Sequence, residues 1–172
     1  EPTIEKSVSG SKDAFVETLR INTSLVRRKL HTPALKLQQT VVGRQSETTV
    51  AVLYVDGIAD PARVQRILDK LDTIDEQALL GRGDLEPYLT QRPRALLPQL
   101  GQTERPDKFA GELLDGCVGL LVDGLPMGYL LPTTFRLLMH APEDESHHYL
   151  LASALIVLRY FALAISLTFP AL

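Results

Sequence analysis

The sequence predicts an α/β domain, a mixed sheet with flanking helices and a β-hairpin, that runs into the start of a helical membrane domain. Stretches of helical periodicity alternate with strand-like stretches. An Asp-Gly pair at 123–124 separates two apolar runs, as a hairpin turn does. The last residues, 149–172, contain a single charge. We therefore interpret the chain as a fragment of a membrane protein: a linker from an upstream subdomain (1–12), a soluble α/β subdomain (13–140), a juxtamembrane connector (141–148) and a truncated first transmembrane helix.

Composition limits the function classes. The chain has 172 residues, 45% of them hydrophobic and 23% charged, which is enough for one compact domain with a core. A formal net charge of −3 argues against nucleic-acid binding, because that relies on clustered Lys and Arg. Cys117 is the single cysteine, so an internal disulfide is excluded and core filling is the simplest interpretation.

The N-terminal half predicts a helix, two strands and a second helix. An apolar line at helical spacing predicts the first helix over 12–30, with Ser11 as a candidate N-cap. Residues 35–42 alternate as a half-exposed strand does, whereas 48–55 is apolar on both faces and predicts a central strand. A cap followed by proline starts the second helix, which runs over 60–71.

Two polar features of the first helix need an explanation. Asn22 falls on the buried line, where an amide needs hydrogen-bond partners. It is either a structural bracket to a neighbouring loop or part of a recognition surface. Arg27 opens the basic run Arg27-Arg28-Lys29 at the end of the helix, where cations complement the carbonyl end of the helix dipole.

After an irregular stretch over 75–102, rich in Gly and Pro, a third helix is predicted from 105 or 106 to 115. We expect it to end at Gly116 in the left-handed conformation and to bury Phe109, Leu113 and Leu114.

The next two apolar runs predict a β-hairpin with arms 117–122 and 125–131. Asp123-Gly124 readily supplies the two positive φ angles of a type I′ turn. Pro126 cannot donate to a strand ladder, so we expect the second arm to lie at a sheet edge. A short amphipathic helix over 135–140 follows.

The apolar segment 149–172 decides the class. As a helix it would span roughly 36 Å, more than the hydrocarbon thickness of about 30 Å. A wholly buried helix of a soluble domain is the alternative, but so small a domain cannot easily surround one. Arg159 near the middle is costly against lipid, which predicts further membrane helices for it to face.

No catalytic or metal-binding signature is evident. The connector contains metal-ligand residue types, but their spacing matches no zinc pattern and a polar juxtamembrane role fits better. Gly-x-Ser-x-Gly is missing from the sequence, so we expect no enzyme activity, no metal and no cofactor. The residues of these types are His140, directly before the connector, and Glu143, Asp144, Glu145, His147 and His148 within it.

A different kind of signal lies in Thr103-Glu104-Arg105-Pro106-Asp107. A cap candidate, acids, a guanidinium and a proline stand in one turn, which predicts a rigid corner with an internal ion pair. Preceded by Pro98-Gln99 and followed by Gly116 and the Asp123-Gly124 turn, it resembles the core signature of the GerA family, the A subunits of bacterial spore germinant receptors. The similarity extends over nearly the whole chain and includes Phe15 with Glu17, Asn22, Arg27, Gly43-Arg44, Tyr54, Gly57, Glu143-Asp144, Tyr149, Arg159 and Pro170.

Two departures stand out. The chain has Gly10-Ser11 where the family commonly has Gly-Pro, and its connector is longer than the family's Glu-Asp-Tyr-Tyr. The resemblance implies a multi-pass protein of the spore inner membrane with this domain on the cytoplasmic side, B and C partner subunits, and a homo-oligomer that conducts ions. The stage V sporulation AF protein, a sporulation paralogue, is not distinguished.

Our first hypothesis is a nutrient-receptor subunit that acts in assembly and in signal transmission to the membrane helices. The alternatives are a small-ligand-binding domain of a membrane sensor or transport-like protein, or a sporulation paralogue without nutrient sensing. The candidates for assembly or coupling are Asn22, Arg27, Thr103, Glu104, Arg105, Pro106, Asp107, Glu143, Asp144 and Arg159.

Overall fold

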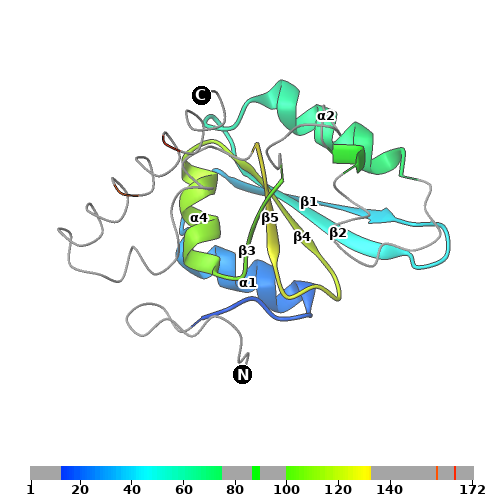
Figure 1. Cartoon of the computed structure of the whole chain (residues 1–172), viewed down its shortest axis with the longest axis horizontal. Helices are drawn as coiled ribbons and strands as arrows, with labels where there is room; N and C mark the ends of the chain where they lie inside the picture. Colours follow the sequence, from blue (N-terminus) through cyan, green and yellow to red (C-terminus); the bar gives the residue numbers. More distant parts are fainter. Residues whose placement is uncertain (1–12, 75–86, 90–99, 133–157, 159–164, 166–172) are drawn as a thin grey trace. The chain divides into compact units, whose positions relative to one another are not determined.

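A five-stranded sheet in the order β1-β2-β4-β5-β3 carries helices on both faces (Figure 1). The computed structural model describes residues 13–74, 87–89, 100–132, 158 and 165. The elements are α1 (Leu19–Lys29), β1 (Leu35–Val42), β2 (Thr48–Val55), α2 (Pro61–Asp72), β3 (Gly101–Thr103), α4 (Pro106–Leu114), β4 (Val118–Val122) and β5 (Gly128–Leu131).

Every neighbouring pair in this sheet is antiparallel, so the predicted mixed sheet is wrong. The reason lies in α4. It returns the chain to the end of the sheet where β2 finishes, so β4 begins there and runs back against β2, with Leu53 opposite Gly119. The α/β class itself is confirmed.

The β1–β2 hairpin matches the prediction in both strands. β1 lies at the edge and is half exposed, whereas β2 lies between β1 and β4 and is mostly buried. The turn between them takes positive φ at Gly43 and Glu47, which lets the chain reverse within five residues.

α2 covers one face of the sheet. Asp60 caps it by accepting from the Ala62 N–H at 3.0 Å, and Pro61 fills the first turn, as predicted. Its apolar side joins a core with β2, β4 and β5. That side consists of Val64, Ile67 and Leu71.

The opposite face is covered by α1 and α4, and its centre is Phe109. The ring of Phe109 lies on two glycines of β4 and β5, where a Cβ on Gly128 would stand 2.6 Å from its Cδ2 and a Cβ on Gly119 would overlap it. The Phe15 ring meets Phe109 edge-on, with centroids 5.4 Å apart. Leu114, predicted to be buried, is 48% exposed; it is the last residue of α4, whose buried side consists of Pro106, Phe109, Ala110 and Leu113.

The predicted β4–β5 turn is wrong in type and length. β5 begins only at Gly128, and positive φ occurs at Gly124 but not at Asp123, so the turn is not type I′. Pro126 lies in the loop, outside the strand. β5 is internal rather than an edge, because β3 pairs with its outer side.

The first helix begins at Leu19 instead of residue 12, since the segment before it is extended and held by other parts of the domain, as described below. Gly116 ends α4 with a φ of 90°, as predicted. Ser11, the connector and most of 149–172 lie outside the described residues; Leu158 and Ile165, within that span, are helical and exposed. Among the residues described, no helix has the length and apolar character needed to span a bilayer.

We expect Gly119→Ala to destabilise the domain, because the new methyl group meets a rigid ring that is already enclosed. Overpacking of this kind costs about 1–3 kcal/mol. The matched control is Gly111→Ala, on the exposed side of α4 with open space around it, which should stabilise by about 0.5–1 kcal/mol. Urea unfolding measures both. An unchanged midpoint for Gly119→Ala would contradict the packing described.

Candidate functional site

The segment 13–18 enters α1 without helical structure, and its backbone bonds to two other parts of the domain. The Phe15 N–H donates to the Glu104 carbonyl at 2.8 Å, and the Glu17 carbonyl accepts from the Gly124 N–H at 2.8 Å. These bonds connect residues more than eighty positions apart in the sequence. They replace the helical bonds that the periodicity predicted for this stretch.

Asn22 holds the same segment from within α1. Its side chain is fully buried; Oδ1 accepts from the Val16 N–H at 2.8 Å, and Nδ2 donates to the Val16 carbonyl. One amide thereby satisfies both backbone groups of a residue in an extended segment. The structural alternative for Asn22, a bracket to a neighbouring stretch of chain, is confirmed.

Asp123 caps α1 from the far end of the sequence. Thr18 occupies the N-cap position but makes no side-chain cap bond; instead the Leu19 N–H donates to Asp123 Oδ1 at 2.9 Å. The Asp123 N–H donates to the Thr49 carbonyl at 3.0 Å. A single turn residue therefore links the start of α1 to β2 and to the β4–β5 loop.

The corner between β3 and α4 contains the predicted ion pair. Arg105 is 6% exposed, and its guanidinium grips Asp107 through two bonds, Nη2 to Oδ2 at 2.6 Å and Nε to Oδ1 at 3.2 Å. The Arg105 N–H donates to Thr103 Oγ1 at 3.2 Å. Pro106 follows in the first turn of α4, so the corner is fixed at the backbone and at the side chains.

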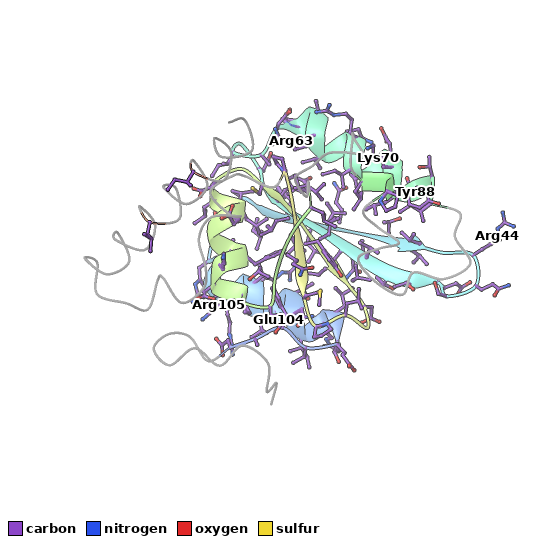
Figure 2. All side chains as sticks on the ribbon, in the orientation of Figure 1. Arg44, Arg63, Lys70, Tyr88, Glu104 and Arg105 are labelled. Carbon is purple, nitrogen blue, oxygen red and sulfur yellow. The ribbon has the colours of Figure 1, made fainter. Side chains whose placement is uncertain are left out.

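Burial acts to raise the pKa of Asp107, but the hydrogen bond and the charge of Arg105 outweigh it, and the net result is a lowered pKa. The carboxylate stands at the positive end of α4, which adds to its preference for the ionised form. Figure 2 shows Glu104 and Arg105 at the start of α4, on the side of the sheet that α1 occupies.

We name the group Asn22, Glu104, Asp123 and Gly124 the N-terminal clamp, because each of the four bonds the segment 13–18 or the first residue of α1. The Thr103–Asp107 corner supports it by fixing Glu104. The sequence singled out Asn22 and Glu104, and it marked Asp123-Gly124 only as a turn. No local signal indicates that Asp123 caps a helix 104 residues before it.

Other predicted residues lie elsewhere. Arg27 is exposed near the far end of α1, away from the clamp. The next two residues of the run both pair with Asp13: Lys29 Nζ lies 2.9 Å and Arg28 Nη2 lies 3.7 Å from Asp13 Oδ2. The basic run Arg27-Arg28-Lys29 therefore forms ion pairs with Asp13 in addition to its position in the last turn of α1. Glu143, Asp144 and Arg159 fall outside the described residues.

Cys117 is buried beside Glu112, and burial followed by the Glu112 charge raises the pKa of its thiol to about 12. The thiolate is therefore strongly disfavoured, which agrees with core filling. Within the described ranges, no three His, Cys, Asp or Glu side chains gather as a metal site would require.

The clamp and its corner contain several of the residues that carry the family resemblance, and comparison with known proteins identifies the same family. The model of the family described as Bacillus/Clostridium GerA spore germination protein matches residues 1–172. The chain belongs to the GerA family. Its curated relatives include spore germination protein GerQA of Bacillus cereus, 38% identical over 168 residues, and membrane protein YfkQ of Bacillus subtilis (strain 168), 36% identical over 172.

These matches cover 97% and 100% of this chain and 34% of each relative, so the chain spans about a third of the length of the GerA proteins it matches. Stage V sporulation protein AF of Bacillus subtilis (strain 168) is 35% identical over 145 residues, 83% of this chain and 29% of that protein. The fold matches the N-terminal domain of the A subunit of the Bacillus megaterium spore germinant receptor GerK3, with a TM-score of 0.58 and 36% identity over 72% of this chain and 98% of that one.

We expect Asp123→Ala to destabilise this GerA domain by about 1 kcal/mol, because the first N–H of α1 loses its acceptor. Asp123→Asn is the matched control, since it keeps an oxygen in the same position and should lie close to the wild type. Urea unfolding midpoints measure the difference. Equal losses for the two variants would show that the cap bond does not matter to stability.

The Arg105–Asp107 pair should make stability depend on pH in the acid range. Because the folded pKa of Asp107 lies below its ordinary value of 3.8, the stabilisation is complete above that value and disappears as the pH falls through the folded pKa. We expect wild type to exceed Asp107→Asn by about 1–2 kcal/mol at neutral pH, a figure reduced for the partial exposure of Asp107.

The measurement compares urea midpoints of wild type and Asp107→Asn from neutral pH to about pH 3. The gap between them should stay constant down to about pH 5 and narrow below about pH 4. A gap that widens on acidification would mean that the ionised carboxylate is not what stabilises the corner.

Proposed function

We propose that this chain is part of an A-type subunit of a nutrient germinant receptor in the spore inner membrane. In this role the domain helps to assemble the subunit and transmits a conformational signal to membrane helices, without bond-making chemistry. The observation that supports it is the N-terminal clamp. The polar residues typical of the family are directed at the domain's own backbone, where they fix how the chain enters α1.

The clamp lies at one end of two buried, paired strands, β4 and β5. Gly124 leads into the β4–β5 loop, and both strands are buried along their whole length. β5 runs antiparallel to β4 from Gly128, near the clamp, to Leu131. Leu131 lies opposite Val118, at the end of β4 away from the clamp. From there the chain continues toward the apolar segment 149–172.

Transmission therefore has a defined direction in our proposal. A force on the segment 13–18 acts on the β4–β5 loop through Gly124 and Asp123, and β5 carries it across the sheet toward residue 132. A signal of this kind needs an element with two alternative arrangements. The longer connector and the apolar segment would form that element, with B and C subunits and further copies of the chain as the surrounding partners.

We expect Arg105→Ala spores to germinate slowly in nutrient while the protein remains in the membrane at a normal level. The substitution leaves Asp107 without its partner and loosens the corner that fixes Glu104. Arg105→Lys keeps the charge but cannot form the two-bond grip, so it should be intermediate. Arg66→Ala, which removes an exposed arginine 3.9 Å from Asp60 on α2, is the matched control.

Germination is measured as the loss of optical density after nutrient addition, with immunoblots of the spore membrane for protein level. Normal germination kinetics in Arg105→Ala spores would show that the Thr103–Asp107 corner takes no part in signal transmission. An equal defect in Arg66→Ala spores would point to a general effect of losing an arginine.

The similarity to stage V sporulation protein AF supports a second candidate, a sporulation role without nutrient sensing. A deletion strain separates the two. Loss of the response to one nutrient, with normal spore yield, favours the receptor subunit. A normal response to every nutrient that wild-type spores use favours the sporulation role.

A further inference from the structure

The sequence contains three Asp-Gly pairs, and the fold places each of them directly after a strand or a helix. They are Asp56-Gly57 after β2, Asp115-Gly116 after α4 and Asp123-Gly124 after β4. The glycine has a positive φ in all three, 82°, 90° and 84° in chain order. The pairs therefore share their sequence and their glycine conformation, and they differ in their hydrogen bonds.

An Asp-Gly pair can rearrange without an enzyme. The glycine nitrogen attacks Cγ of the protonated aspartate side chain and a C–N bond forms. The N–H proton and the hydroxyl of the carboxyl group leave as water, which gives a five-membered succinimide ring. Water then opens the ring at the main-chain carbonyl, and the chain continues through the former side-chain carboxyl as isoaspartate. The mass is unchanged, and no oxidant or reductant is consumed.

Both reacting groups of Asp123-Gly124 are held by the N-terminal clamp. The Gly124 N–H donates to the Glu17 carbonyl at 2.8 Å, and Asp123 Oδ1 accepts from the Leu19 N–H at 2.9 Å. Attack of this nitrogen on this carboxyl would break both bonds, and with them the attachment of the segment 13–18 to the β4–β5 loop. The clamp therefore protects this pair.

Asp115-Gly116 is held by the end of α4. The Gly116 N–H donates to the Leu113 carbonyl at 3.2 Å, and the Asp115 N–H donates to the Gly111 carbonyl at 3.1 Å. The attacking nitrogen and the residue before it are thus both bonded to the last turn of the helix. Attack would require this turn to open.

Asp56-Gly57 has neither restraint. Both residues are exposed, and within the part of the chain that the structure describes, neither the Gly57 N–H nor the Asp56 carboxylate has a hydrogen-bond or ion-pair partner. The two residues are the centre of a turn closed by the Ile58 N–H, which donates to the Val55 carbonyl at 3.2 Å. That bond spans the Asp56–Gly57 peptide without using it. The peptide can therefore rotate while the turn stays closed, since glycine accepts φ of either sign.

We propose that Asp56 is a modification site, at which the side chain isomerises spontaneously to isoaspartate, while the bonds of the folded domain protect Asp115 and Asp123. The product has one additional carbon in the main chain, and its carboxylate is attached directly to Cα. The added carbon lies inside a turn that is also closed by the N–H of the buried Ala59, which donates to the Val55 carbonyl at 2.9 Å. The modification therefore alters the connection between β2 and α2.

The test uses the whole protein in isolated membranes, incubated for several weeks at mildly acidic pH. Trypsin then separates the sites. Cleavage after Arg44 and Arg63 gives a peptide that contains Asp56, and cleavage after Lys108 gives one that contains Asp115 and Asp123. Mass spectrometry with electron-based fragmentation identifies isoaspartate at each position. We expect isoaspartate to accumulate with time at Asp56, with no change in peptide mass, and to stay at its starting level at the other two positions.

Two controls separate the effect of the fold from the effect of the sequence. The same protein unfolded in guanidinium chloride should form isoaspartate at all three pairs, because the protecting bonds are lost. Asp56→Glu keeps the charge at an exposed position but would need a six-membered ring. We therefore expect the folded Asp56→Glu protein to show no rearrangement at residue 56.

Equal accumulation at the three pairs of the folded protein would show that the bonds give no protection, and it would overturn the proposal. So would a folded protein without isoaspartate at Asp56 after the unfolded protein has formed it, because the turn would then protect this pair too. A signal that persists in the Asp56→Glu peptide would come from Asp60 and would also contradict the assignment. None of these outcomes depends on the germination phenotype of Arg105 variants.

Discussion

The contact between Phe109 and the two glycines beneath it determines how the α1–α4 side of the domain is built. Because Gly119 and Gly128 have no side chains, α4 lies directly on β4 and β5. The ring of Phe109, which belongs to α4, fills the space above the two glycines. That position sets where α4 begins, and so where the Glu104 carbonyl points. The Phe15 ring packs edge-on against Phe109, and the backbone N–H of Phe15 donates to the Glu104 carbonyl. The path of the chain into α1 therefore follows from a packing contact in the core.

Local patterns predicted the elements whose signals are contained in their own residues. β1, β2 and α2 match within a residue or two, since alternation, a continuous apolar run and a proline-led amphipathic stretch each depend on near neighbours. The missed element, β3, is three residues long and has no pattern of its own. It is a strand because it completes the hydrogen bonds of β5. The start of α1 was wrong for a related reason, since residues 13–18 find backbone partners elsewhere in the domain that outweigh helix formation.

In the candidate site too, contacts between residues close in sequence could be predicted, and contacts between distant residues could not. The Arg105–Asp107 pair and the bracket at Asn22 could be predicted because their partners lie within six residues, in one corner or beside one helix. Asp123 could not, because an aspartate before glycine is fully explained by a turn. Its second use, as the cap of α1, depends on the order of strands that brings the β4–β5 loop to that helix.

A single strand, β2, separates the outer strand β1 from β4, which leads into the clamp. The Asp123 N–H donates to the Thr49 carbonyl, and Thr49 lies opposite Val41 of β1. Paired backbone therefore connects the residue that caps α1 to the outer strand β1. Because β1 pairs with β2 along its whole length, we expect a displacement of the β4–β5 loop to reach β1 through β2.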